Sequence, residues 1–254
     1  MTQSIKEIKT RLFDPQFDDL AYFAALKEDA RIGVKKLIEQ YEKQQMKQQQ
    51  LLTKFQEMSI FEQAAYADGV RFIAGIDEVG RGPLAGPVVA AAVILPKDSQ
   101  ILGLNDSKQL SQKKKDALFV EIQNQAIAIG IGVVPHDEID RLNIYQASRL
   151  AMKIALEDLA ITPEYVLVDA MTIDTAIKQQ SLIKGDARSN SIAAASIIAK
   201  VYRDNLMIDF HHTYPHYGFD KNAGYGTKVH LEGLKTHGIC PIHRKTFAPV
   251  KQYV

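Results

Sequence analysis

The spacing of apolar residues changes near residue 70. Before that point, apolar side chains recur at intervals of three and four residues, as on one helix face, at positions 20, 23 and 24 and again at 34, 37, 38 and 41. Residues 44–50 are polar and rich in glutamine, which is typical of an exposed helix or a loose connection. An amphipathic stretch follows over residues 51–66. We therefore predict a small N-terminal helical module, of two or three helices, over residues 1–70.

Beyond residue 70, short apolar runs separated by glycine predict strands at 72–76, 88–95, 128–134 and 165–168. Glycines and Pro83 predict a turn or bulged hairpin at residues 80–86. Helical patterns span residues 113–125 and 145–159, and Asn143 is placed to cap the second. A further helix is predicted to start at Ser189 or Ser191, with alanines that allow close packing on a sheet. This alternation predicts an α/β domain with a partly parallel sheet over residues 71–254.

The composition is that of an ordinary globular protein, since 46% of the 254 residues are hydrophobic and the formal net charge is +1. No apolar run approaches ~20 residues, the length of a membrane span, and the polar N-terminus predicts no secretory signal. Cys240, the single cysteine, excludes an internal disulfide and a cysteine-cluster zinc site. We expect a cytoplasmic protein without a membrane partner. Basic residues gather after residue 200, which suits either phosphate contact or a solvated surface.

Three acidic residues, Asp77, Glu78 and Asp169, stand where apolar strands end. Carboxylates are rarely buried unpaired because desolvation of the charge is costly, and a divalent cation would compensate that cost. Asp77 and Asp169 would meet if their strands were parallel neighbours, because ligand sites form at the carboxyl ends of such strands. Adjacent residues of a regular strand point to opposite faces. We therefore expect the strand to end or bulge near Glu78 if both acids serve one site.

A fourth acid, Asp186, precedes the alanine-rich helix. It could simply favour the helix start through the helix dipole, or it could join the other three. Four acids without a cysteine or histidine cluster favour a hard cation, Mg²⁺ or Mn²⁺. Residue types and spacing thus lead to a metal-dependent α/β enzyme, with phosphates as candidate substrates.

Together these segments resemble the ribonuclease HII family. The similarity begins at residues 75–88, GIDEVGRGPLAGPV, and continues at residues 104–110, LNDSKQL. It includes Asp169, then residues 184–186, KGD, and residues 191–204, SIAAASIIAKVYRD. It ends with residues 214–219, YPHYGF, residues 224–227, GYGT, and the pair His243 and Arg244. The motifs occur in family order over roughly residues 70–250, and residues 1–70 resemble the extension of some bacterial members.

The resemblance implies an RNase H-like mixed sheet flanked by helices, with C-terminal helices, and cleavage of RNA within RNA–DNA hybrids. It also implies incision on the 5′ side of ribonucleotides embedded in duplex DNA, leaving 3′-hydroxyl and 5′-phosphate ends. The family's catalytic acids correspond to Asp77, Glu78, Asp169 and Asp186, of which the first three would ligate metal most directly. Two Mn²⁺ or Mg²⁺ ions about 3.5–4 Å apart would stabilise the attacking and leaving oxygens.

The resemblance also implies how ribose is distinguished from deoxyribose. The backbone of the loop formed by Gly80, Arg81 and Gly82 would face the 2′-hydroxyl, since glycine lets the chain approach a ligand closely. Tyr225 would sense the same hydroxyl and pack against the next sugar. Without the neighbouring acids, the loop would be interpreted as a plain turn and Tyr225 as a loop anchor.

Other residues have weaker signals. Ser107 and Lys108 match a family segment and are candidate phosphate contacts, with a loop cap and a solvated lysine as the alternatives. We interpret the histidines at 211, 212 and 216 as surface or packing residues, and Tyr202 and Phe219 as core aromatics. Four more basic residues are candidates for backbone contact or for structural roles: Lys184, Arg188, Lys200 and Arg244.

Two alternatives remain open. Ribonuclease HIII also has an accessory N-terminal region, but its corresponding loop typically lacks the arginine found at position 81. A catalytically silent nucleic-acid-binding protein would not need all four acids. We expect a monomer whose partners are RNA–DNA hybrids and DNA duplexes containing ribonucleotides, with any replication or repair partner unidentified.

Overall fold

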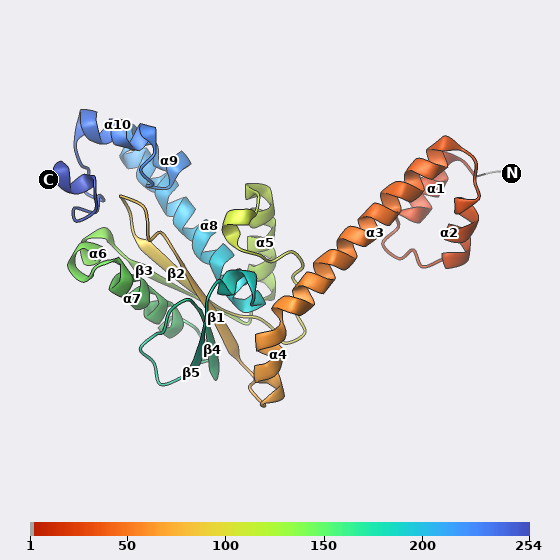
Figure 1. Ribbon diagram of the computed structural model, residues 1–254, viewed down its shortest axis with the longest axis horizontal. Coiled ribbons are helices and arrows are strands. Elements are labelled where there is room, and N and C mark those ends of the chain that lie inside the picture. The colour runs from red at the N-terminus through yellow and green to blue at the C-terminus, as the bar shows by residue number, and fades with distance from the viewer. Residues whose placement is uncertain (1–2) are drawn as a thin grey trace. The chain divides into compact units, whose positions relative to one another are not determined.

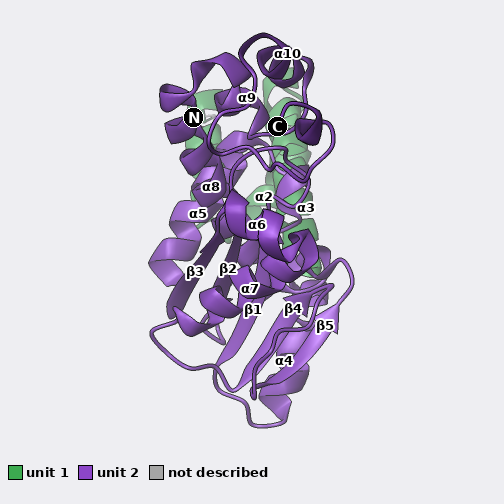
Figure 2. Ribbon diagram, turned by 90° about the vertical axis from the view of Figure 1, so that its left-hand side faces the viewer, with its two compact units in different colours: residues 1–54 green, residues 55–254 purple. Residues whose placement is uncertain are grey.

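The computed structural model describes residues 3–254, and the chain divides into two compact units, residues 1–54 and residues 55–254 (Figure 2). Residues 1 and 2 lie outside the described residues. They begin the N-terminal stretch for which we predict no secretory signal. No helix within residues 3–254 is long and apolar enough to span a membrane. Contacts place residues 55–70 with the second unit, while the predicted division of the sequence at residue 70 stays a prediction.

The first unit consists of helices whose apolar faces meet. Its elements are α1 (Ile5–Leu12), α2 (Leu20–Lys27) and most of α3 (Ile32–Met58), which continues into the second unit. Residues predicted to share helix faces, including positions 34, 37 and 38, are buried in one hydrophobic cluster. The glutamine-rich residues 44–50 form exposed helix rather than a loose connection. The predicted N-terminal helices are therefore confirmed.

The second unit is built on a five-stranded sheet in the order β3-β2-β1-β4-β5 (Figure 1). β1 pairs antiparallel with β2, and β2 with β3, whereas β1 pairs parallel with β4, and β4 with β5. The predicted α/β class with a mixed sheet is confirmed. The strands are β1 (Ile73–Val79), β2 (Val88–Ile94), β3 (Ala128–Val134), β4 (Tyr165–Asp169) and β5 (Lys178–Leu182).

Helices cover both faces of this sheet (Figure 1). α7 (Ile144–Glu157) packs on one face, while α5 (Gln112–Gln125) and α8 (Asn190–Thr213) pack on the other. The C-terminal part contains α9 (Phe219–Asn222) and α10 (Lys228–His237), as the resemblance implies. The remaining elements are α4 (Ile60–Ala67), α6 (His136–Leu142) and the short 3-10 helices η1 (Ser107–Gln109), η2 (Gly185–Ala187), η3 (Pro215–Tyr217) and η4 (Val250–Gln252).

The apolar pattern predicts neither α6 nor β5. α6 has only seven residues, and β5 is an edge strand whose side chains are mostly polar, so neither has a clear periodic signal. Asn143 caps α7 as predicted, because its side chain accepts the Gln146 amide at 3.1 Å. Of the two predicted core aromatics, Phe219 is buried, but Tyr202 is 39% exposed and its assignment to the core is wrong.

α8 lies close to the sheet because both surfaces are small. Residues 193–195 of α8, all alanine, are fully buried against it. A β-carbon at Gly75 of β1 would lie 2.1 Å from the carbonyl carbon of Ser191, so only glycine fits there. This close approach sets the first turn of α8 against the amino-terminal half of β1.

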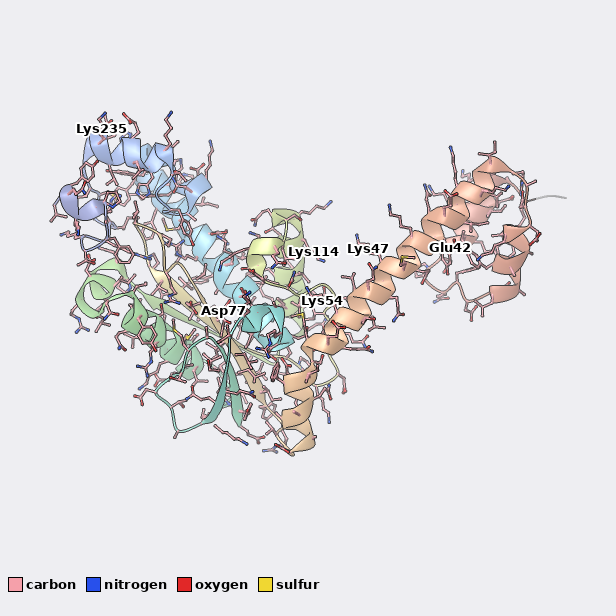
Figure 3. All side chains as sticks on the ribbon, in the orientation of Figure 1. Glu42, Lys47, Lys54, Asp77, Lys114 and Lys235 are labelled. Carbon is pink, nitrogen blue, oxygen red and sulfur yellow. The ribbon has the colours of Figure 1, made fainter. Side chains whose placement is uncertain are left out.

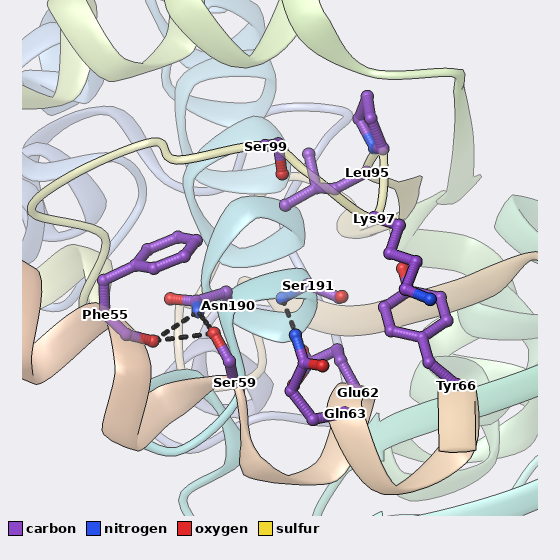
Figure 4. Close-up of a pocket in the computed structure, with 11 residues that line it drawn as sticks. Phe55, Ser59, Glu62, Gln63, Tyr66, Leu95, Lys97, Ser99, Asn190 and Ser191 are labelled. Atoms are coloured by element: carbon purple, nitrogen blue, oxygen red, sulfur yellow. Dashed lines mark hydrogen bonds between the residues drawn. The ribbon is translucent and has the colours of Figure 1, made fainter. Parts of the chain in front are cut away.

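The start of α8 is capped by a carboxylate from α4 (Figure 4). Glu62, which is 5% exposed, accepts two hydrogen bonds at Oε1, from Ser189 Oγ at 2.6 Å and from the Ser191 amide at 3.0 Å. A negative charge at this end of a helix is favoured by the helix dipole. Glu62 therefore ties α4 to the turn that precedes α8.

A second pair of contacts reinforces this attachment. Asn190 Nδ2 donates to the Phe55 carbonyl at 2.9 Å and to Ser59 Oγ at 2.8 Å (Figure 4). Both acceptors lie at the end of α3 or just after it. Residues 55–62, which are not part of the sheet, thus hold the start of α8. This helix begins four residues after Asp186 in the sequence.

We predict that Glu62→Ala lowers the free energy of unfolding by about 1–3 kcal/mol, because Ser189 Oγ and the Ser191 amide are left without their buried acceptor. Urea unfolding followed by circular dichroism measures this decrease. Glu57→Ala, at an exposed position of α3, is the matched control and should unfold at the wild-type urea concentration. Equal midpoints for the two variants would contradict the capping role.

Candidate active site

Parallel pairing of β1 with β4 brings predicted acids together. The register pairs residues 73–76 with residues 165–168, so Asp77 and Asp169 come next at the ends of neighbouring strands. Asp77, Glu78 and Asp169 each offer a carboxylate oxygen, and these atoms all lie within 4.8 Å of one another. Figure 3 labels Asp77 at the sheet within the second unit. The predicted convergence of Asp77 with Asp169 is thus seen in the geometry.

β1 ends one residue after Glu78, at Val79, and it does not bulge. β1 keeps a regular register with β2 through Val79, which pairs with Val89. The pairing of β1 with β4 stops earlier, at Ile76, which leaves that side of the strand open. Asp77 Oδ1 accepts the Glu78 amide at 2.8 Å, so its carboxylate turns along the strand. Because the Asp77 carboxylate turns along the strand and the edge of β1 toward β4 is unpaired there, the side chains of Asp77 and Glu78 reach a common site.

Burial and mutual repulsion raise the pKa of these carboxyls. Burial, followed by the negative charges of Glu78 and Asp169, raises the pKa of Asp77 well above its usual value, while a hydrogen bond from Ser196 opposes the rise. Burial raises the pKa of Glu78 to about 7, although the positive charge of Arg81 opposes this shift. Such a cluster strongly favours a compensating cation.

The turn η2 places Asp186 beside the cluster. The Gly185 amide donates to Asp169 Oδ1 at 2.6 Å, which joins η2 to the end of β4. Burial, then the negative charges of Asp106 and Asp169, raises the pKa of Asp186 to about 6, while the charge of Lys108 opposes the shift. Asp106 is an acid near the site that sequence reasoning did not single out, because no apolar strand precedes it.

The donor set fits a hard divalent cation. Glu78 Oε2 is buried and has no hydrogen-bond partner among residues 3–254. Its other oxygen, Oε1, has a long contact of 3.5 Å with Arg81 Nη1. The cluster offers carboxylate oxygens alone, which are the ligands that Mg²⁺ and Mn²⁺ prefer.

The second unit also brings Tyr225 to the loop of residues 80–82. Tyr225 is 42% exposed, and a β-carbon at Gly82 would lie 3.4 Å from its Cε1 atom. The Leu84 amide donates to the Gly224 carbonyl at 2.8 Å, which fastens one loop to the other. The two parts predicted to recognise ribose are therefore neighbours.

Arg244 is fully buried, which favours the structural role over phosphate contact among the two roles that the sequence leaves open. Its guanidinium donates to three carbonyl oxygens, those of Gly80 at 2.6 Å, Arg81 at 3.0 Å and Gly86 at 3.0 Å. The sequence reports the charge of an arginine but not its burial. This arginine acts on the backbone of the loop rather than on solvent.

Arg203 is also fully buried and was not singled out from the sequence. It donates to the carbonyls of Pro87 at 2.9 Å, Ala85 at 3.2 Å and Ala223 at 2.8 Å. The last of these belongs to the segment that leads into Tyr225. Arg203 therefore links the two loops through their main chains.

The weaker candidates differ in position. Ser107 is 3% exposed and its Oγ lies 3.1 Å from Ser196 Oγ, which favours a structural role. Lys108 is exposed and close enough to the acids for its charge to oppose the rise of the Asp169 pKa. Lys200 pairs with Asp204 at 2.7 Å.

The histidines form contacts of two kinds. His216 stacks on His237, with ring centroids 4.0 Å apart, in keeping with a packing role. A buried pair was not predicted: His230 Nε2 lies 2.9 Å from His243 Nε2, and His230 Nδ1 lies 3.0 Å from the Tyr225 carbonyl. Burial, then the charge of His230, lowers the pKa of His243 to about 4. This pair supports the backbone of the Tyr225 loop.

Comparison with known proteins is consistent along the chain. The family model described as Ribonuclease HII matches residues 74–250, and the model described as Ribonuclease HII N-terminal domain matches residues 4–66. The chain is 58% identical to a ribonuclease HII of Enterococcus faecalis over 252 residues, which is 99% of this chain and 98% of that protein.

Solved structures are similar as well. Ribonuclease H2 from Pyrococcus horikoshii matches with a TM-score of 0.62 and 27% identity, over 72% of this chain and 96% of that chain. Bst-RNase HIII in complex with Mn²⁺ shares the fold, with a TM-score of 0.56 and 20% identity over 72% of this chain and 68% of that chain.

We predict that the Glu78 carboxyl makes the metal-free protein lose stability as pH rises from about 6.5 to 8. Because the pKa of Glu78 is raised to about 7 in the folded state, the folded chain holds a proton that the unfolded chain has already released, and this advantage disappears as pH passes that value. Unfolding by urea in the presence of chelator, repeated across this pH range, measures the slope.

Glu78→Gln should remove this loss, so that its stability falls less with pH than that of the wild-type protein, whereas Glu157→Gln, at an exposed position, should keep the wild-type slope. The buried His230 and His243, whose pKa values are lowered, oppose the loss at the lower end of the range, but they do so equally in all three proteins. A slope that is identical in all three proteins would rule out Glu78 as its source.

Proposed function

The chain belongs to the ribonuclease HII family, and we propose that it is a divalent-metal-dependent endonuclease that cleaves RNA in RNA–DNA hybrids. We further propose that it incises duplex DNA on the 5′ side of embedded ribonucleotides, leaving 3′-hydroxyl and 5′-phosphate ends. The observation that carries the proposal is the convergence of three carboxylates at the end of the β1–β4 pair, in the same compact unit as a loop bordered by Tyr225.

Asp77, Glu78 and Asp169 would hold the metal, and Asp186 would complete the site when substrate is present. A pair of Mn²⁺ or Mg²⁺ ions bound there would supply Lewis-acid chemistry: it would lower the pKa of the attacking water and neutralise the negative charge that develops on the leaving 3′ oxygen. The Gly185 amide holds the Asp169 carboxylate in position at 2.6 Å. Lys108, whose charge acts on both Asp169 and Asp186, is the candidate for contact with a substrate phosphate.

Selection of ribose belongs to the loop of Gly80, Arg81 and Gly82 together with Tyr225. The loop backbone would face the 2′-hydroxyl, the single group that separates RNA from DNA at that position. The exposed Tyr225 ring lies against Gly82, where it can meet both that hydroxyl and the following sugar. Ser107 is the less favoured substrate contact because it is buried.

We also propose that residues 1–70 are a helical extension and that residues 71–254 are the catalytic domain with its C-terminal helical segment. The two family models, which divide the chain at a similar place, support this. We propose that the protein acts as a monomer on its nucleic-acid substrates.

Asp169→Asn should lower incision at a single embedded ribonucleotide by at least about a hundredfold, because the change in charge removes a metal ligand with almost no change in volume. The assay uses a labelled DNA duplex with one ribonucleotide, first with Mn²⁺ or Mg²⁺ and then with chelator. Asp174→Asn is the matched control, since its side chain is 87% exposed, and it should cut at the wild-type rate.

Near-normal activity of Asp169→Asn would remove this residue from the site. Binding of the duplex without metal-dependent incision by the wild-type protein would favour a silent nucleic-acid-binding protein. Cleavage confined to runs of several ribonucleotides would favour a function like that of ribonuclease HIII.

Tyr225→Ala should reduce the preference for the RNA–DNA junction more than it reduces metal binding, because the ring lies beside the loop and the carboxylates are untouched. Incision of a junction substrate and of an all-RNA strand in a hybrid, compared in one assay, gives the preference. Calorimetric titration with Mn²⁺ gives the metal affinity. An unchanged preference would count against the sensing role.

A further inference from the structure

The guanidinium groups of Arg203 and Arg244 are buried against backbone oxygens rather than against acids. Both side chains are fully buried, and neither forms an ion pair with an acid among residues 3–254. Burial lowers the pKa of Arg203 to about 10 and that of Arg244 to about 9. A charge without a counterion in such a place is costly. Here the carbonyl oxygens that the two guanidinium groups bind take the place of a counterion.

Two of the carbonyls bound by Arg244 belong to consecutive peptide groups, those that follow Gly80 and Arg81. In a planar trans peptide the C=O and the next N–H point in opposite directions. The amides of Arg81 and Gly82 therefore point away from the buried guanidinium, and both residues are exposed. Within the part of the chain that the structure describes, neither amide donates a hydrogen bond to the protein.

We propose that Arg244 is a positioning residue for ribose recognition. By holding the carbonyls of Gly80 and Arg81, it turns the amides of Arg81 and Gly82 outward as a preset pair of donors for the substrate 2′-hydroxyl. This inference rests on the proposed function and assigns the orientation of the loop to one buried side chain.

Arg203 fixes the place of the same loop. Gly80 has a φ of 95°, and a β-carbon there would lie 2.2 Å from Arg203 Nε, so the guanidinium occupies the space that any other residue would need. Arg203 also holds the carbonyl of Ala223, at the start of the Tyr225 loop. The amide donors and the tyrosine are thereby parts of one rigid arrangement.

Lysine cannot replace Arg244 in this role. A guanidinium is a planar fork with five donors, whereas an ammonium is a single point with three. The three acceptors of Arg244 are the carbonyls of Gly80, Arg81 and Gly86, bound by three different nitrogens. Arg244→Lys keeps the charge but must release at least one of the two loop carbonyls.

The test measures binding of two duplexes to the full-length protein in chelator, by fluorescence anisotropy. One duplex has a single ribonucleotide, and the other has deoxyribose at the same position. The wild-type protein should bind the first more tightly, and Arg244→Lys should reduce the ratio of the two affinities about fivefold for each amide that no longer donates to the 2′-hydroxyl. Affinity for Mn²⁺, measured by calorimetry, should not change, because the acids lie on other elements.

Arg149→Lys is the matched control. Arg149 also donates to a backbone carbonyl, that of Thr172 at 2.9 Å, but on a helix that covers the other face of the sheet. This variant should keep the wild-type ratio. A wild-type ratio in Arg244→Lys would overturn the positioning role alone, whereas a wild-type protein that neither prefers nor incises the ribonucleotide duplex would overturn the proposed function together with it.

A second measurement does not depend on the folding of any variant. In ¹⁵N-labelled wild-type protein, the amide resonances of Arg81 and Gly82 should shift more with the ribonucleotide duplex than with the all-DNA duplex. Equal shifts with both duplexes would overturn the assignment of these amides as the donors.

Discussion

The parallel pairing of β1 with β4 is the constraint on which the site depends. It aligns the carboxyl ends of two buried strands, and it stops one residue before Asp77. Main-chain pairing up to that point fixes the height of both strands, and its absence beyond that point leaves room for side chains to converge. The backbone hydrogen bonds between β1 and β4 thus hold the two strand ends together, and their favourable free energy offsets the repulsion between the carboxylates.

Two kinds of contact shape the surroundings of the acids: close packing of α8 on the sheet, and hydrogen bonds from buried arginines to loop carbonyls. α8 approaches through alanines and meets Gly75, so the walls near the acids are made of backbone and small side chains. Farther along α8, Arg203 holds loops by their carbonyls together with Arg244 from the C-terminal segment, and the amides of Arg81 and Gly82 are left free to face outward. The first kind of support creates room for cations, and the second creates donors for a sugar.

Much of this arrangement could be predicted from residue types. Asp77 and Asp169 follow apolar runs, and that pattern is sufficient to place them at strand ends. The sequence left the role of Arg244 open because its burial arises from loops more than 150 residues away along the chain. β5 was missed because an edge strand has no need of an apolar pattern. The route by which Glu78 joins Asp77 depends on where the pairing of β1 with β4 stops, which no local pattern reports.

The contact between Glu62 and the start of α8 has a consequence for any shortened form of the chain. Ser189 Oγ and the Ser191 amide share one acceptor that is supplied from a distant part of the chain. Removal of residues 1–70 would therefore leave two buried donors at that helix start without their acceptor. The helix that follows Asp186 thus depends on a side chain that precedes the first strand of the sheet.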